Sequence, residues 1–384
     1  MKVTKFLLNL AAPLTALAFA FALTAIFLVI GGLNPGSAFS SMFDYGFQTE
    51  SIISSINRAL PLYISAMAVA IGFKMNLFNI GVEGQYQIAA LIAAWVAGAI
   101  ALPPYLHIPI VLVTAMVVGS LWSGIAGVLK VTRGVHEVIS TIMLNNIVLT
   151  GLAAYLLRTY LEVEPDPSIA NPVPQTATIP ASGRFPSFNR LLEAVGIESR
   201  NVELWGFLLV AILLGIGYHY LVNRTRFGYD LRISGISPGA ARAAGVDPKA
   251  MVVKTMLLSG AVAGLVGMPH LLCYFFNYSI DFPTYLGFNG LSVALLGRNH
   301  PVGMAAGALL FGWFDRAAQI LDLRNVPKEI SRIMQGLILL SVVVVYEVVR
   351  RRIERMEVQA AAKATAALGG ATPAAGTAGG GSGA

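Results

Sequence analysis

The amino-acid sequence predicts an all-α, polytopic membrane protein with about ten transmembrane helices. Three observations carry this prediction: only 12% of the 384 residues are charged, 56% are hydrophobic, and apolar runs of span length recur along the chain. A soluble domain carries about twice this share of charge, and roughly 20 apolar residues are needed to cross a bilayer as a helix. A β-barrel is excluded, because its strands would be about ten residues long and would alternate in polarity.

The individual spans follow from the apolar runs and from the polar or Pro/Gly-rich segments that separate them. The first run follows a basic start. Its Ala18-Phe19-Ala20 motif resembles a signal-peptide cleavage site but lies in the middle of the run and not at its end, which favours an uncleaved signal-anchor. The seventh run is interrupted by Pro269, and the eighth by Gly287 and Gly290. The expected spans lie near 7–30, 51–71, 77–101, 108–129, 138–157, 205–222, 251–276, 284–297, 301–321 and 330–349.

The basic residues predict the orientation of the chain. With the N-terminus in the cytoplasm, Lys74, Lys130, Arg133 and the basic segment 223–250 all lie inside, and the acidic loop 158–204 lies outside. The positive-inside rule therefore favours cytoplasmic N- and C-termini. We expect residues 1–357 to form the transmembrane domain, with a short interfacial helix near 190–195 in the outer loop. Residues 358–384, rich in Ala and Gly, are expected to be a disordered cytoplasmic tail.

The stretch Gly72–Gln85 joins two apolar runs, yet it carries Lys74, Asn76, Asn79, Glu83 and three glycines. A carboxylate near hydrocarbon costs roughly 2.5–3.5 kcal/mol, so a water-filled or ligand-filled cavity is one way to accommodate Glu83. The alternative is that Glu83 is an ordinary first-turn acid at the watery end of a helix. The pattern alone leaves both interpretations open.

A short, weakly repeated sequence predicts a duplicated, inverted arrangement of spans. Phe78-Asn79-Ile80-Gly81 opens the third span, and Phe288-Asn289-Gly290 lies in the eighth, five spans later. An odd offset makes the two copies run in opposite directions, and Gly-interrupted segments at matching places indicate a site near the membrane midplane. Glu83 could instead hold helices together by accepting hydrogen bonds from a neighbouring span. The residues expected to line or shape a route through the membrane are Asn79, Glu83, Gln85, Asn145, Asn146, Phe288 and Asn289.

Motifs for catalysis and metal binding are missing from the sequence. It has no Gly-x4-Gly-Lys-Ser/Thr loop for ATP and no His-Glu-x-x-His, and its lone Cys273 permits no intrachain disulfide. We therefore expect neither an enzyme nor a metal site. The net charge of +7 is explained by basic residues on the cytoplasmic side of the membrane, so it does not predict nucleic-acid binding.

Other features predict helix packing. Gly260/Gly264 and Gly303/Gly307 have the spacing at which small residues let helices approach closely. Asp315 and Arg316 are adjacent and point about 100° apart on a helix, so either each finds a different partner or the span ends near them.

Four landmarks, in order along about residues 50–350, carry a family resemblance. They are Phe78–Gln85, His136–Asn145, the loop from Asn223 through Ala240-Ala241-Arg242-Ala243-Ala244-Gly245-Val246, and Gly287–Arg298. Together they resemble the permease subunits of bacterial ABC importers for nucleosides and simple sugars, within the branched-chain amino acid and ribose permease superfamily. The Asn-Ile-Gly-Val-Glu-Gly-Gln form and the long outer loop look most like the nucleoside type, with a simple sugar as the alternative substrate.

The resemblance implies a location and a set of partners. These are the bacterial inner membrane and its lipid, a second homologous permease, a cytoplasmic ATP-binding cassette ATPase, and an extracytoplasmic substrate-binding lipoprotein. No cofactor is expected in this chain, since ATP would be bound by the ATPase. An ATP-independent carrier or channel is the competing class, but it leaves the Ala-Ala-Arg-Ala-Ala-Gly loop unexplained. A short helix there would dock on the ATPase through Arg226, Gly228, Arg232, Gly235, Ala240, Ala241, Arg242 and Gly245.

Overall fold

The computed structural model describes residues 34–163, 173–197 and 201–322, together with residues 15, 18–19, 21–32 and 199 and seven positions between 333 and 351. The chain forms two compact units: Gly31–Gln335, and the chain ends Met1–Ile30 with Gly336–Ala384. In the latter, Phe21–Ile30 is an apolar helix. Most of the predicted tenth span and the whole tail 358–384 lie outside the described residues, so the boundary at 357 stays a prediction.

The described part of Gly31–Gln335 is helical apart from loops and two isolated bridges, Gln175–Ser279 and Ser187–Trp205. Each expected span from the second to the ninth corresponds to a helix, which confirms the all-α prediction. The helices are α2 Pro35–Gly46, α3 Thr49–Phe73, α4 Val82–Ala99, α5 Pro104–Arg133, α6 Glu137–Ile147 with α7 Ala153–Leu156, α8 Asn189–Ala194, α9 Phe207–Arg224, α10 Arg226–Ile236, α11 Pro238–Ala243, α12 Pro248–Gly264 with α13 Met268–His270, α14 Leu286–Leu296, α15 Pro301–Ala317 and α16 Gln319–Asp322. Turns of π-helix join α6 to α7 and extend α7 and α13.

Among the described residues, five helical segments are long and apolar enough to cross a membrane: Thr49–Phe73, Pro104–Arg133, Glu137–Leu161, Phe207–Arg224 and Pro248–Phe275. On α5 the exposed side chains Val113, Val117 and Leu121 recur every fourth residue and present an apolar stripe suited to lipid. The protein is therefore a polytopic membrane protein. By contrast, α14 has 11 residues and is only about 16 Å long, roughly half the hydrocarbon thickness.

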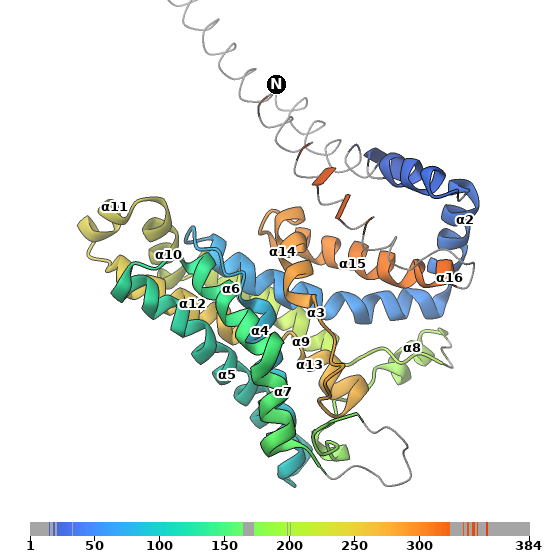
Figure 1. Cartoon of the computed structure of the whole chain (residues 1–384), viewed down its shortest axis with the longest axis horizontal. Helices are drawn as coiled ribbons and strands as arrows, with labels where there is room; N and C mark the ends of the chain where they lie inside the picture. Colours follow the sequence, from blue (N-terminus) through green and yellow to red (C-terminus); the bar gives the residue numbers. More distant parts are fainter. Residues whose placement is uncertain are drawn as a thin grey trace, which may run out of the picture. The chain divides into compact units, whose positions relative to one another are not determined.

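The helix pairs repeat with a two-fold pattern. Helices α3 and α12 are largely buried and pack on each other, while α5 lies along α12 and α15 lies along α3 (Figure 1). Likewise α4 packs on α5 and α12, as α14 packs on α15 and α3. Exchanging α3 with α12, α4 with α14 and α5 with α15 maps these contacts onto one another. This is the packing expected of an inverted repeat offset by five spans.

Close backbone contacts hold these pairs together, as the small-residue spacing predicted. A Cβ on Gly260 would overlap the carbonyl oxygen of Gly119, and one on Gly264 would overlap that of Ala115, so α12 and α5 touch at their backbones. On α15, a Cβ on Gly303 would overlap the carbonyl oxygen of Gly297, which follows α14.

The neighbours Asp315 and Arg316 on α15 have different partners, which is one of the two predicted alternatives. Asp315 forms an ion pair with Arg58 of α3. Arg316 donates to Oε1 of Gln319 at 2.7 Å and lies 4.9 Å from the ring centre of Tyr45 on α2. The two charges therefore join α15 to two different helices.

The described part of the loop 158–204 packs onto the helices. Its short helix α8 confirms the helix expected near 190–195. The backbone N–H of Ile179 donates to the carbonyl of Phe276 at 2.7 Å, and Nδ1 of His107 lies 2.9 Å from Oγ of Ser182. The loop is thus bonded to α5 and to the 276–285 connection before α14.

The α5–α12 contact generates a stability prediction. Gly260→Ala should lower the free energy of unfolding by about 1–3 kcal/mol, because its Cβ would overlap the Gly119 backbone. The matched control is Gly217→Ala on the exposed side of α9, where nothing lies within 4 Å of an added Cβ. That change should stabilise by roughly 0.5–1 kcal/mol through helix propensity. Thermal melting of the purified protein measures both, and equal effects would contradict the close α5–α12 contact.

Candidate functional site

The starts of α4 and α14 meet at the carboxylate of Glu83. Its Oε1 accepts from the backbone N–H of Tyr285 at 2.5 Å and from the hydroxyl of Tyr86 at 2.9 Å, and its Oε2 accepts from the N–H of Gly287 at 2.7 Å. The first N–H groups of a helix have no partner within the helix, and the helix dipole favours an anion there. Glu83 is itself in the first turn of α4 and 1% exposed, so one buried carboxylate joins the two helix starts.

The junction depends on close backbone approach. A Cβ on Gly287 would overlap the backbone of Glu83, and one on Gly290 would overlap the side chain of Ser65 on α3. Tyr285 has φ of 69°, a left-handed conformation that is rare for an aromatic residue. With the backbone turned in this way, the N–H of Tyr285 reaches Glu83. The left-handed backbone at Tyr285 and the close approach allowed by Gly287 and Gly290 together fix the position at which α14 begins.

A second buried pair lies beside the junction. Asn79 donates from Nδ2 to Oε1 of Gln85 at 3.0 Å, and Gln85 donates back from Nε2 to Oδ1 of Asn79 at 2.8 Å. Asn79 also donates to Oγ of Ser259 on α12 at 2.8 Å, and Ser259 donates to the carbonyl of Ala68 on α3 at 2.6 Å. With Gly81 N–H as a further donor to Oδ1, the amide of Asn79 uses its full hydrogen-bonding capacity.

Asn145 attaches α6 to the same place. Its Oδ1 accepts from the N–H of Gly84 at 2.9 Å, and its Nδ2 donates to the carbonyl of Ile80 at 2.9 Å. A Cβ on Gly84 would lie 2.9 Å from Cα of Asn145, so the glycine makes room for the contact. Asn145 therefore acts as a cap for α4 supplied by another helix.

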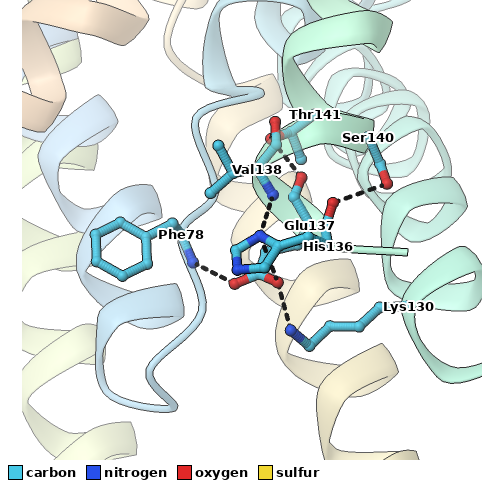
Figure 2. A network of polar contacts seen from close by, with 7 residues as sticks. All are labelled: Phe78, Lys130, His136, Glu137, Val138, Ser140 and Thr141. Atoms are coloured by element: carbon cyan, nitrogen blue, oxygen red, sulfur yellow. Dashed lines mark hydrogen bonds and ion pairs between the residues drawn. The ribbon is translucent and has the colours of Figure 1, made fainter. Parts of the chain in front are cut away.

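A further buried acid, Glu137 at the start of α6, was not among the predicted site residues. Figure 2 shows its carboxylate facing Lys130, with which it forms an ion pair, and the backbone N–H of Phe78, which donates to Oε1 at 3.3 Å. Nδ1 of His136 lies 3.5 Å from Oε2 and accepts from the N–H of Val138 at 3.3 Å. An acid opening an apolar run shortly after a lysine was the signal that could have indicated this pair.

The structure divides the seven predicted route residues into two groups. Asn79, Glu83, Gln85 and Asn145 are buried and bonded to protein groups, whereas Asn146 is exposed, Phe288 is 38% exposed and Asn289 is half-buried. The contacts of Glu83 are those of the alternative interpretation, in which it accepts hydrogen bonds from a neighbouring span. The route itself stays a prediction.

An apolar cleft of 540 Å³ lies between α3, α9 and α15, with Tyr63, His219 and His300 as its main polar side chains. None of the predicted route residues lines it. Within the described residues, no cluster of three or more His, Cys, Asp or Glu side chains could hold a metal.

The basic segment 223–250 forms a hairpin of α10 and α11, and we call Arg226–Gly245 the coupling hairpin. The short helix expected there is present as α11. Arg226, Ala240, Arg242 and Gly245 are exposed. Ile236, the last residue of α10, is 83% exposed and was missed by the sequence analysis, since one isoleucine gives no pattern.

The other predicted coupling residues pack within the chain. Arg232 donates to the carbonyl of Val222, and Ala241 is fully buried. A Cβ on Gly228 would overlap the carbonyls of Leu221 and Val222 at the α9–α10 turn. Substitutions at these positions would disturb the hairpin itself before any partner is involved.

Comparisons with known proteins agree over most of the chain. The family described as "Branched-chain amino acid transport system / permease component" matches residues 51–343. The guanosine ABC transporter permease protein NupP of Bacillus subtilis is 33% identical over 347 residues, 90% of this chain and 96% of that protein. The nucleoside ABC transporter permease protein NupB of Lactococcus lactis is 30% identical, covering 86% of this chain and 90% of that protein. No solved structure gave a significant match.

The junction generates a prediction about Glu83. Glu83→Ala leaves the N–H groups of Tyr285 and Gly287 without an acceptor, and should cost roughly 2–6 kcal/mol because each buried orphan costs about 1–3 kcal/mol. Glu83→Gln keeps one acceptor oxygen and should cost roughly half as much. Thermal melting in lipid nanodiscs measures both.

The control for Glu83 is Glu193→Ala, which removes an exposed acid from α8 and should stay within about 0.5 kcal/mol of the wild type. Wild-type melting of Glu83→Ala would show that the carboxylate does not hold the two helix starts.

Proposed function

Because this chain belongs to the permease component family of branched-chain amino acid transport systems, we propose that it is the membrane-spanning permease subunit of an ABC importer for nucleosides. The observation that carries the proposal is the nearly full-length similarity to two permeases named for guanosine and nucleosides. A permease conducts its substrate and catalyses no reaction, so the chain needs no catalytic group of its own.

The relatives support a second, different permease as partner. Bacillus subtilis has both NupP and NupQ, and Lactococcus lactis has both NupB and NupC, so two distinct permeases occur in each organism. This chain is 33% identical to NupP but 25% identical to NupQ, and 30% identical to NupB but 26% identical to NupC. It thus corresponds to one member of each pair, which favours a heterodimer in the bacterial inner membrane.

The coupling hairpin suits an ATPase partner. It presents the exposed Tyr229 and Ile236 of α10 beside the exposed basic residues Arg226 and Arg242, and the exposed Ala240 and Gly245 are small enough to allow close approach. Arg226 and Arg242 can form charge-assisted hydrogen bonds with acidic groups of that partner. In this arrangement the hairpin and both termini lie in the cytoplasm, ATP is bound by the partner, and the loop 158–204 faces a substrate-binding lipoprotein outside.

The route for the nucleoside is proposed to follow those of the predicted residues that are exposed or half-buried. Asn146, Phe288 and Asn289 would line it, while the buried Asn79, Glu83, Gln85 and Asn145 would shape it by fixing α4, α6 and α14. Weak, dispersed hydrogen bonds allow a substrate delivered by a binding protein to pass, whereas a deep well would retain it. Three of the seven predicted residues would thus contact the substrate, and the other four would hold the helices around it.

The proposed substrate can be tested by uptake into proteoliposomes that contain the whole importer. ATP should drive accumulation of radiolabelled guanosine, because NupP is named for guanosine and NupB for nucleosides. The glucose ABC transporter permease of Haloferax volcanii is 29% identical over 86% of this chain, so glucose is the second substrate to measure. ATP-driven glucose uptake without guanosine uptake would favour the sugar, and uptake without ATP would contradict the importer.

Docking of the ATPase generates a further prediction. Ile236→Ser should weaken binding of the ATPase by about tenfold or more, since a central exposed apolar anchor typically contributes over 1 kcal/mol. Ala240→Glu should do the same by holding the surfaces apart. Val195→Ser, which changes a side chain 77% exposed near α8, is the matched control and should bind normally. Unchanged co-purification and ATPase activity with both hairpin variants would place docking elsewhere.

A further inference from the structure

The connection between α3 and α4 touches the coupling hairpin directly. Asn76 donates from Nδ2 to the backbone carbonyl of Gly235 in α10 at 2.8 Å. A Cβ on Gly235 would lie 2.6 Å from Cα of Met75 and 3.0 Å from the carbonyl oxygen of Lys74. The two backbones are therefore in contact, and only a glycine in α10 permits this.

The start of this connection is held firmly in place. Met75 is 5% exposed, and its sulfur accepts from Oγ1 of Thr255 on α12 at 3.1 Å. Asn76 has φ of 54°, a left-handed conformation that asparagine adopts more readily than most residues. Burial, and next the charge of Arg232 in α10, lower the pKa of Lys74. Because this segment is closely packed, a movement of α10 would displace its backbone directly.

The far end of the same connection holds the junction. Phe78 donates its N–H to Glu137, Asn79 is bonded to Gln85 and to Ser259, and Glu83 accepts from the N–H groups that begin α14. Only six residues lie between Asn76, which contacts the hairpin, and Glu83, which holds α14. Between them the backbone N–H groups of Leu77, Phe78, Ile80 and Gly81 are all hydrogen-bonded to protein groups.

We propose that residues 74–83 are a transmission segment that carries displacement of the coupling hairpin to the meeting point of α4 and α14. Asn76 is its positioning residue, acting through Gly235 and touching no substrate. The inference rests on the proposed ATP-driven import and adds the element that joins the ATPase surface to the route. The competing path runs from α10 through its packing on α12, which bypasses Asn76.

The test compares transport with ATP hydrolysis in the reconstituted importer. Asn76→Gly removes the amide but keeps the left-handed backbone at no steric cost, and Asn76→Asp keeps the shape but cannot donate. Both should retain ATPase binding and substrate-stimulated hydrolysis within about twofold. The number of guanosine molecules accumulated per ATP hydrolysed should fall roughly 2- to 30-fold, the usual range for loss of coupling.

Two further variants separate transmission from a merely structural role. Gly235→Ala, which pushes the hairpin from Met75, should reproduce the loss of coupling. Thr132→Ala is the matched control: it removes a 2.7 Å hydrogen bond to the Val128 carbonyl within α5, near Lys130, and should leave the ratio unchanged. Melting temperatures of all variants show whether any loss comes from unfolding.

A double-mutant cycle between Asn76→Gly and Glu83→Gln gives the decisive readout. Sites without contact normally act independently, so non-additive effects on the transport-to-hydrolysis ratio would support one connected segment. Additive effects, or normal ratios in both Asn76 variants, would overturn the proposal and favour the path through α12. If the wild-type complex shows no ATP-driven uptake, the proposed function fails, an outcome distinct from intact import that ignores Asn76.

Discussion

The rest of the structure depends on the hydrogen bonds that the carboxylate of Glu83 accepts from the start of α14. Helix α14 is too short to cross a bilayer, and the backbone N–H groups of Tyr285 and Gly287 at its start donate to this carboxylate. In hydrocarbon such unsatisfied groups cost several kcal/mol each, so non-helical backbone is tolerated only where other protein groups or a cavity satisfy it. Glu83 accepts from the start of α14 while its own negative charge lies in the first turn of α4. The helix starts stabilise the negative charge of the acid, and the acid accepts hydrogen bonds from N–H groups at the start of α14.

The two-fold pattern of helix pairs explains why this meeting point exists. Because α4 and α14 occupy equivalent positions in the two repeats, both are preceded by an irregular connection, and both connections are held by neighbours. Asn79 and Asn145 secure the first, while the loop 158–204 bonds to the second through residues such as Ile179. Buried polar groups of this kind are costly unless every member is satisfied, and here the amides of Asn79 and Gln85 pair with each other.

The proposed import function requires some contacts to stay while others change. The backbone contacts of α5 with α12 have no room for adjustment, because glycines there already allow the closest approach. The coupling hairpin, by contrast, meets the central helices through a small surface around Gly235 and through α12. The segment 74–83 is the part of the α3–α4 connection that lies against the hairpin, through Asn76 and Gly235.

Sequence alone determined the membrane class, the helices of the second to ninth expected spans, the helix α8 and the short α11, because these follow from apolar length, Pro and Gly spacing, and local polarity. It also identified the polar residues of the junction as unusual. Only the tertiary structure decided their roles, because the partners of Glu83 lie about 200 residues away along the chain. The neighbours Asn145 and Asn146 illustrate the limit: one caps α4 and the other faces outward. Adjacent residues on a helix point about 100° apart, and which direction is buried depends on packing that no local pattern encodes.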